Sequence, residues 1–403
     1  MSLARRVFFL VVALVTALGW TACSGGCPTT SLSSSGGPGS GTAGSVTAGG
    51  TICGPGNNGT GGTSAALLYY LGTNDILGAS LTTSATFANL TSITPPTLPS
   101  SVGSDMIVVN KSFLYLPQSD SLTIQAFTID HTSGALTAIS GSPFPTAAAD
   151  SVASDPAGRF LFVGNNTTGQ VSVFQINSTT GALVQAPNSP FTAFNLDFAH
   201  VLAVDGTGKF LYVGQGAAFL PVFGFSIDQN TGALAQIIGG PFPLNVAGVR
   251  TDFTGKFAVG LSGTAGDNNL YVFAIDPATG ALSSVTGSPF PTVASTLFDL
   301  RIHPSSQFVY SFGQNAGGGM AAIEGFTLNP TSGGLTALAA SPFTTLPLVA
   351  DCKWDQGGAE AFCANFANNA FSVLSTDVST GALTHSVTDL SVASNAVPFV
   401  PTN

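Results

Sequence analysis

From residue 65 onward, short apolar runs alternate with turns rich in Gly, Asp, Thr and Pro. Each run is apolar throughout or at alternate positions, as in Phe-Leu-Phe-Val at 160–163 and Val-Ser-Val-Phe-Gln-Ile at 171–176. Such runs are typical of β-strands, and no stretch shows the 3.6-residue period of an amphipathic helix. The pattern therefore predicts an all-β domain over residues 65–403, made of many short strands.

The runs belong to a unit that repeats about every 48 residues. One hairpin phrase, Asp-x-x-Thr-Gly-Ala-Leu with small variations, ends at Leu136, Leu183, Leu234, Leu282, Leu335 and Leu383. A second phrase, Asp-x-x-Gly before an apolar run, precedes it at 155–164, 205–214 and 252–260, and Ser-Pro-Phe or Gly-Pro-Phe follows the first phrase in five units. In both phrases the Asp side chain caps a turn and the Gly supplies a positive φ.

Each unit thus predicts four antiparallel strands, A to D, which is typical of a β-propeller blade. Six complete units begin near residues 102, 150, 198, 247, 297 and 348. Residues 66–93 supply strands B, C and D of another blade, and residues 396–401 supply its strand A. We therefore predict a seven-bladed β-propeller whose ring is closed by the N- and C-terminal strands, which removes exposed sheet edges.

The units resemble the lactonase seven-bladed β-propeller family, also described as 6-phosphogluconolactonase-like, and the YVTN-type repeat propellers. The resemblance covers residues 65–403 and rests on the phrase 155–163, on His303-Pro304 in the equivalent turn, on the Thr-Gly-Ala-Leu hairpins and on the terminal Pro-Phe-Val-Pro. It implies hydrolysis of sugar lactones without a metal or other cofactor. These motifs are structural, so they specify the fold more strongly than the activity.

The first 64 residues have a different composition. Arg5 and Arg6 precede an apolar run, 7–18, that is shorter than the ~20 residues of a membrane span, so we expect a signal peptide over 1–22. Trp20-Thr21-Ala22-Cys23 resembles a bacterial lipobox, which predicts a lipid anchor on Cys23, with ordinary secretion as the alternative. Residues 23–64 are rich in Gly, Ser and Thr and form a tether. These features predict a bacterial lipoprotein of the cell envelope, in the periplasm or at the cell surface.

The net charge limits the possible binding partners, and the cysteines predict a disulfide. The formal net charge is −10, and loss of residues 1–22 leaves seven basic against nineteen acidic residues. Such acidity argues against binding of nucleic acid or anionic membrane surfaces, so we expect contact with the membrane only through the lipid anchor. We also expect a monomer. Cys352 and Cys363 flank the turn 355–358, which predicts a disulfide across a hairpin, with two buried thiols as the alternative. Cys27 and Cys53 lie in the tether, and a bridge between them stays open.

Candidate acid–base residues lie five positions before the turn Asp that follows strand A. This position reads Asp150, His200, Ala247, Phe298 and Ala350 in successive units. Lactone hydrolysis needs a base to activate water, and Asp150 and His200 on adjacent blades are the candidates for the base and its partner. The alternative is that both are ordinary polar residues of the rim.

Basic residues recur two positions before the same turn, as Arg250, Arg301 and Lys353 on three successive blades. They form either a cationic patch that binds a phosphate or carboxylate, or an ion-pair ladder with Asp299 and Asp351, which lie two residues earlier. In the ladder, Arg250 is expected to be left unpaired and to bind an anion. His131, His303 and His385 are too scattered to predict a zinc site.

Two functions remain open from the sequence. The first is a membrane-tethered binding or scaffold module of the cell envelope, which binds an unknown small molecule or an envelope protein. The second is a metal-independent hydrolase of sugar lactones, and only this hypothesis makes the protein an enzyme. Convergence of Asp150, His200 and Arg250 on one pocket would favour the hydrolase.

Overall fold

The computed structural model describes most of the region after residue 65. The described residues are 66–71, 76–81, 87–89, 105–119, 121–192, 199, 201–216, 220–244, 246–262, 264, 266–314, 321–343, 349–365, 370–385, 389–391 and 399–401. All of them belong to one compact unit, Thr51–Asn403. The predicted signal peptide (1–22), Cys23 and the tether (23–64, with Cys27 and Cys53) lie outside these residues, as does His200. No helix in the described parts is long and apolar enough to cross a membrane.

The described strands form seven antiparallel sheets, which we number as blades in chain order. Blade 1 contains β1 (Ala66–Leu71), β2 (Ile76–Leu81), β3 (Phe87–Asn89) and β31 (Phe399–Pro401). Blade 2 contains β4 (Ile107–Val109), β5 (Phe113–Gln118), β6 (Thr123–Ile129), β7 (Leu136–Ala138) and β8 (Phe144–Pro145). Blade 3 contains β9 (Ser151–Ser154), β10 (Phe160–Gly164), β11 (Val171–Ile176) and β12 (Leu183–Gln185).

The later blades repeat this order. Blade 4 contains β13 (Val201–Val204), β14 (Phe210–Gly214), β15 (Phe223–Ile227) and β16 (Leu234–Gln236). Blade 5 contains β17 (Val249–Thr251), β18 (Phe257–Leu261), β19 (Asn269–Ile275), β20 (Leu282–Ser284) and β21 (Phe290–Pro291). Blade 6 contains β22 (Thr296–Ile302), β23 (Phe308–Gln314), β24 (Ala321–Leu328) and β25 (Leu335–Ala337). Blade 7 contains β26 (Val349–Trp354), β27 (Glu360–Asn365), β28 (Ala370–Thr376), β29 (Leu383–His385) and β30 (Leu390–Ser391).

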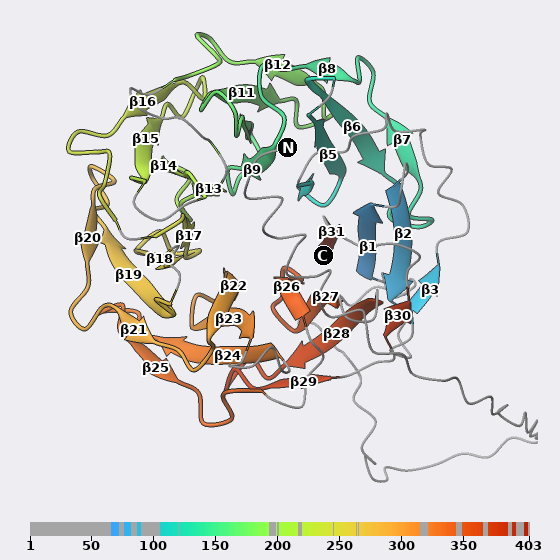
Figure 1. The fold of residues 1–403 in the computed structure, drawn as a ribbon. Coiled ribbons are helices and arrows are strands. Elements are labelled where there is room, and N and C mark those ends of the chain that lie inside the picture. The colour runs from blue at the N-terminus through green and yellow to red at the C-terminus, as the bar shows by residue number, and fades with distance from the viewer. Residues whose placement is uncertain are drawn as a thin grey trace, which may run out of the picture. The chain divides into compact units, whose positions relative to one another are not determined.

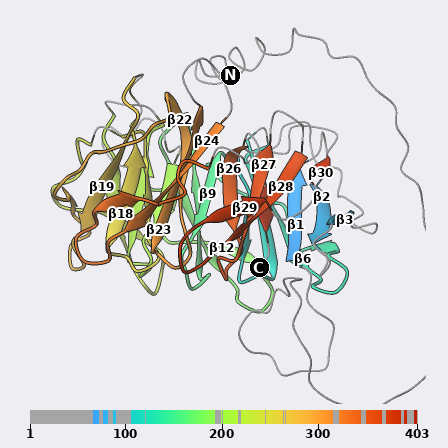
Figure 2. The same ribbon diagram turned by 90° about the horizontal axis from the view of Figure 1, so that it is seen from below.

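The seven blades close into a ring. The innermost strands touch their neighbours in the order β31, β4, β9, β13, β17, β22 and β26, and β26 touches β31 again. Figure 1 shows this circle, and Figure 2 shows the blades turned by 90°. β31 pairs with β1, with Leu68 opposite Pro401. The predicted seven-bladed propeller, with a blade shared by early and late segments of the chain, is therefore confirmed; residues 396–398 of the predicted strand lie outside the described part.

The two repeated phrases meet at the interfaces between blades. Gly280, in the C–D turn of blade 5, has φ 73° and packs against Phe210 of blade 4. A Cβ atom at Gly280 would lie 2.5 Å from Cδ1 of Phe210, so only glycine fits. Tyr212 of blade 4 donates its hydroxyl hydrogen to the Gly280 carbonyl oxygen at 2.8 Å, and burial raises the pKa of Tyr212.

This contact recurs around the ring. Tyr69, Tyr115 and Tyr310 donate in the same way to Gly134, Gly181 and Gly381 of the following blade, at 2.7 to 2.8 Å. The strand-B tyrosine and the glycine of the next C–D hairpin are therefore complementary partners across an interface. This contact accounts for the regular spacing of both phrases in the sequence.

The A–B turns are held by buried carboxylates. Oδ1 of Asp205, which is 1% exposed, accepts the N–H groups of Lys209 and Phe210 at 2.8 and 2.7 Å. In blade 6 His303 replaces this Asp, and its Nε2 lies 2.7 Å from the Gly358 carbonyl oxygen of blade 7. Burial lowers the pKa of His303, so the neutral ring links the two blades. His303 still caps its turn, since its Nδ1 accepts the N–H of Ser305 at 3.2 Å, and it adds a bridge to the next blade.

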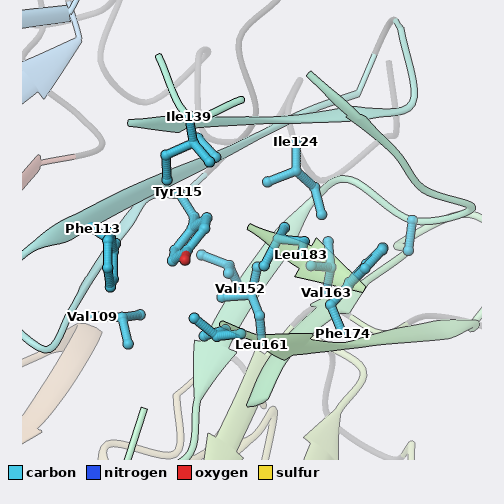
Figure 3. Packing of buried hydrophobic residues seen from close by; sticks show 13 residues of the cluster. Val109, Phe113, Tyr115, Ile124, Ile139, Val152, Leu161, Val163, Phe174 and Leu183 are labelled. Carbon is cyan, nitrogen blue, oxygen red and sulfur yellow. The ribbon is translucent and has the colours of Figure 1, made fainter. Parts of the chain in front are cut away.

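Hydrophobic cores lie between adjacent blades. Figure 3 shows Tyr115 and Ile139 of blade 2 facing Leu161, Phe174 and Leu183 of blade 3. Tyr115 and Leu161 are completely buried. Because each blade offers one face to each neighbour, no blade buries its apolar surface alone, and the ring must close for both faces of every blade to be covered.

Deletion of residues 395–403 removes β31 and leaves blade 1 without its inner strand. We expect a lower midpoint for unfolding of the whole domain, because the edges of β1 and of the inner ring are then exposed. Urea unfolding followed by tryptophan fluorescence measures this effect, with deletion of residues 402–403 alone as the matched control. Equal midpoints for the two deletions would contradict the closure role of β31.

The substitution Tyr212→Phe removes one link between blades and keeps the ring. We expect a loss of about 1–2 kcal/mol in the free energy of unfolding, because the buried Gly280 carbonyl oxygen loses its donor. Tyr271→Phe is the control, since this half-buried hydroxyl donates to Asp267 at a place that water can reach. Equal losses of unfolding free energy in the two variants would show that the Tyr212–Gly280 hydrogen bond contributes no more to stability than a surface hydrogen bond.

Candidate functional site

Three basic side chains occupy one register position on the innermost strands of blades 5, 6 and 7. Arg250 lies opposite Val259, Arg301 opposite Tyr310 and Lys353 opposite Phe362. The same position holds Ile107, Ala153 and Ala203 on blades 2, 3 and 4. The inner face of the ring is therefore apolar on one side and charged on the other.

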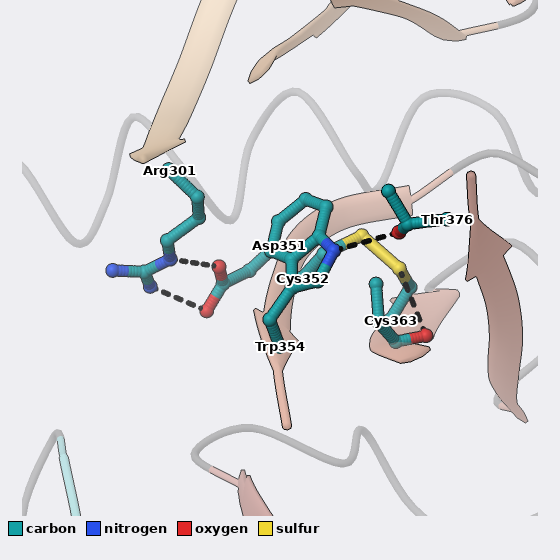
Figure 4. The surroundings of a disulfide bond; sticks show 7 residues. Arg301, Asp351, Cys352, Trp354, Cys363 and Thr376 are labelled. Atoms are coloured by element: carbon teal, nitrogen blue, oxygen red, sulfur yellow. Dashed lines mark hydrogen bonds and ion pairs between the residues drawn. A yellow bond between two sulfur atoms is a disulfide. The ribbon is translucent and has the colours of Figure 1, made fainter. Parts of the chain in front are cut away.

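The charged side forms a series of ion pairs. Arg250 Nη2 lies 3.3 Å from Asp299 Oδ2, and Arg301 Nη2 lies 3.1 Å from the same oxygen. Arg301 also binds Asp351 through Nε and Nη2, each at 2.8 Å, in a bidentate pair shown in Figure 4. We call Asp105, Arg250, Asp299, Arg301, Asp351 and Lys353 the ion-pair chain. Their side chains are 16 to 38% exposed, so water reaches this surface.

The structure thus favours the ladder over the cationic patch. The expectation that Arg250 is unpaired was wrong, because its guanidinium reaches across to Asp299 on the next blade. The two arginines lie on neighbouring inner strands, β17 and β22, which are in contact. Asp299 can therefore accept from both at once.

The partner of Lys353 was not predicted from the sequence. Its Nζ lies 3.4 Å from Oδ1 of Asp105, which comes just before β4 in blade 2. The A–B turn of blade 2 is a two-residue turn with positive φ at Asn110 and Lys111, and it lacks the Asp-x-x-Gly phrase used for alignment. Ile107 pairs with Tyr115 as Arg301 pairs with Tyr310, so Asp105, two residues before Ile107, falls in the same row as Asp299 and Asp351. The shorter turn of blade 2 hides this correspondence in the sequence.

The members of the chain fix one another's ionisation. Burial alone would raise the pKa of Asp299, but Arg301 and Arg250 hold that pKa below its usual range. Burial opposes the charge on Arg301, yet Asp299 and Asp351 raise the pKa of Arg301 above its usual value. Both groups are therefore ionised at neutral pH, and neither is suited to proton transfer.

Two β-bulges correct the alignment of the predicted acid–base row. The register shifts between Leu297 and Asp299 in β22 and between Val349 and Asp351 in β26. Phe298 and Ala350 are thus the extra residues of the bulges, and they do not correspond to Asp150 as the sequence alignment assumed. Leu297 and Val349 take that place, so the late blades still contribute no acid–base group there.

Asp150 lies at the start of the innermost strand of blade 3. Its Oδ2 accepts the N–H of Asn166 at 3.0 Å, and its side chain is half-buried. Because His200 lies outside the described residues, the pairing of Asp150 with His200, and the convergence of both with Arg250, stay predictions. Among the residues that the structure describes, no three His, Cys, Asp or Glu side chains gather in a way that would hold a metal ion.

A disulfide supports the charged side of the ring. Cys352 and Cys363 are bonded across β26 and β27, and both are completely buried, which confirms the predicted pairing. Cys352 stands between Asp351 and Lys353, as Figure 4 shows for Asp351. Trp354 stacks on Tyr310 with ring centroids 4.8 Å apart and donates its Nε1 hydrogen to Thr376 at 2.8 Å. β26, which carries Asp351 and Lys353, is therefore held to the outer strands of blade 7 by the disulfide and the Trp354 hydrogen bond.

The substitution Asp299→Asn leaves Arg250 with no carboxylate and Arg301 with one. We expect a loss of about 1–3 kcal/mol in the free energy of unfolding at pH 7, since the site is only partly buried. Because the pKa of Asp299 is lowered in the fold, its contribution is present above pH ~4 and is lost as the pH falls through the folded pKa. Urea unfolding at pH 7 and pH 3 measures both effects.

Asp228→Asn is the matched control for that measurement. Asp228 caps an exposed C–D turn, and Asn177 and Asn329 cap the equivalent turns of blades 3 and 6. We expect a much smaller change in the free energy of unfolding for this exposed residue, because Asn caps the same turn in other blades. A gap between parent and Asp299→Asn that stays constant from pH 7 to pH 3 would contradict the ionised state of Asp299.

Comparison with known proteins supports the lactonase type of propeller. Residues 80–194 match the family model described as Lactonase, 7-bladed beta-propeller. A search of curated protein sequences finds no match. Two solved structures cover 84% of this chain and 98% of their own: a proposed 6-phosphogluconolactonase from Bacteroides fragilis (18% identity, TM-score 0.64) and the periplasmic gluconolactonase PpgL of Pseudomonas aeruginosa (16% identity, TM-score 0.62). At these identities the two structures show a shared fold, and the family match over residues 80–194 supports the lactonase seven-bladed β-propeller family.

Proposed function

We propose that this protein hydrolyses sugar lactones on the inner face of its ring. The observation that carries the proposal is the ion-pair chain, which holds two guanidinium groups at a water-accessible surface on adjacent inner strands. The match of residues 80–194 to the lactonase model supports the same function, and two of the similar structures are named lactonases. Membership of the whole chain in that family, including the YVTN-type repeat, is part of the proposal.

The chemistry needs hydrogen-bond donors at the carbonyl oxygen. In lactone hydrolysis, water loses a proton to a base as it adds to the carbonyl carbon, and the carbonyl oxygen becomes an oxyanion. The ring C–O bond then breaks, and the ring oxygen leaves as a hydroxyl group by taking up that proton. Arg301 uses Nε and Nη2 for its carboxylate partners, and its Nη1 has no acceptor among the described residues. This nitrogen is a fixed donor held in place by two ion pairs. It can bind the oxyanion without a metal ion.

The water must lose a proton as it attacks. We assign this step to Asp150, with His200 as its partner, because these are the acid–base residues of the predicted row on blades 3 and 4. Asp299 is a poorer base, since Arg301 and Arg250 hold its pKa below the usual range. The proposed site therefore divides the work, with proton transfer on the early blades and oxyanion binding on the late blades.

A second candidate is a binding module of the cell envelope. The ion-pair chain supports it, because its cations are all paired with carboxylates and can still bind a small molecule or an envelope protein through hydrogen bonds. Export, the lipid anchor at Cys23 and the periplasmic or surface location are proposals common to both candidates. They are supported by the sequence of residues 1–64, and a buried disulfide is typical of exported proteins.

Purified protein separates the two candidates by its action on glucono-δ-lactone in a pH-stat. We expect hydrolysis above the spontaneous rate, and a fall of about 10²–10⁴-fold in kcat/KM for His200→Ala, because the base loses its partner. Arg301→Gln is expected to lower kcat by about 10²–10³-fold through loss of the oxyanion donor. Lys256→Gln, in an A–B turn, is the control and should match the parent.

Folding of each variant is checked by its thermal midpoint. If the parent shows no hydrolysis of any sugar lactone, the enzyme proposal is excluded and the binding module remains. If the parent is active and His200→Ala keeps full activity, the reaction is retained but the assigned base pair is wrong.

A further inference from the structure

Resting on the proposed function, we propose that the lactone accepted by this protein is uncharged rather than phosphorylated, and that Asp105 sets this preference. The reason is a balance of charge on the inner face of the ring. A site for a phosphorylated sugar needs cations that are not already neutralised. The described residues of this inner face supply none.

The ion-pair chain contains three cations and three carboxylates. Arg250, Arg301 and Lys353 face Asp299, Asp351 and Asp105, and every cation lies within 3.4 Å of a carboxylate oxygen. The net formal charge of the chain is therefore zero. Asp150 on blade 3 adds a further carboxylate to the inner strands, and the whole sequence carries a net charge of −10.

No other lysine or arginine side chain in the described part of the chain lies on an inner strand. Lys111, Arg159, Lys209 and Lys256 are the other basic residues after position 65, and all of them lie in A–B turns. Arg159 binds Asp155 and the Gln229 side chain. Lys256 donates to the Pro330 carbonyl oxygen in the C–D turn of blade 6, the next blade. These contacts hold the turns to neighbouring hairpins rather than to the inner strands.

A phosphate would have to break existing pairs. Its charge of −1.5 to about −2 at neutral pH calls for at least one free cation. To supply one, Arg301 would have to release its bidentate contact with Asp351 and leave that carboxylate uncompensated in a partly buried site. The ion-pair chain therefore opposes a dianion.

The same chain suits an uncharged polyhydroxylated ring. Nη1 of Arg301 points away from Asp351 in Figure 4 and is a donor for a carbonyl oxygen. The carboxylate oxygens accept hydrogen bonds from sugar hydroxyl groups, while the charges stay paired. The site thus offers donors and acceptors without surplus charge, which is the complement of a neutral aldonolactone.

Asp105 is the member that decides the balance. It comes from blade 2, across β31 from blade 7, and it neutralises Lys353 at 3.4 Å, the longest of the ion pairs within the chain. Removing its charge gives the inner face one surplus cation without touching Arg250 or Arg301. Asp105 is therefore a specificity residue and not a catalytic one.

The test compares glucono-δ-lactone with its 6-phosphate for the parent and for Asp105→Asn. We expect the parent to prefer the uncharged lactone by about tenfold or more in kcat/KM, and Asp105→Asn to shift that ratio by about tenfold toward the phosphorylated lactone, the size of one charge-assisted hydrogen bond. Asp228→Asn is the control with the same change in net charge and should leave the ratio unchanged.

A binding measurement keeps this test independent of catalysis. Calorimetric titration with inorganic phosphate should show no binding to the parent or to Asp228→Asn, and measurable binding to Asp105→Asn. Hydrolysis that favours the phosphorylated lactone in the parent, or parent binding of phosphate equal to that of Asp105→Asn, overturns the inference and leaves the lactonase function intact. Absence of all hydrolysis removes the proposed function, and the phosphate titration then still decides whether Asp105 sets the charge of this face.

Discussion

The structure depends on one contact repeated between blades, in which a glycine of one hairpin lies against an aromatic ring of the blade before it. At Gly280 there is no room for a Cβ atom beside Phe210, and the glycine carbonyl oxygen accepts the Tyr212 hydroxyl. The contact fixes both the distance and the rotation between neighbouring blades. Since an error at each interface would accumulate around the ring, closure requires that each of these contacts be nearly the same.

Closure in turn determines where charge can be placed. The seven inner strands meet around one centre, so side chains from blades far apart in sequence become neighbours, as Lys353 and Asp105 do. Charged groups so close together are stable only in pairs. The ion-pair chain is thus a consequence of the closed ring as much as a feature of any one blade. The disulfide between Cys352 and Cys363 fixes β26, the strand from which Lys353 reaches Asp105 of blade 2.

The fold could be predicted from the sequence because its determinants are local and repeated. Each Thr-Gly hairpin and each Asp-x-x-Gly turn marks its own position, and the count of units gives the number of blades. The site was predictable only in part. The positions of Arg250, Arg301 and Lys353 follow from the repeat, but the partners follow from contacts between blades, which no local pattern records. Asp105 was missed because its blade has a different turn, and Phe298 was misaligned because a β-bulge adds a residue without leaving a sequence signal.

The pairing of β31 with β1 also sets an order on folding. Leu68 lies in the earliest strand described and pairs with Pro401 in the latest. Blades 2 to 7 are each made of consecutive strands and can form as the chain emerges, whereas blade 1 must wait for β31. Contacts so distant in sequence are slow to form, because the entropy of closing the intervening chain is lost before the contact is gained. A growing chain therefore stays an open arc with two uncovered edges until β31 arrives.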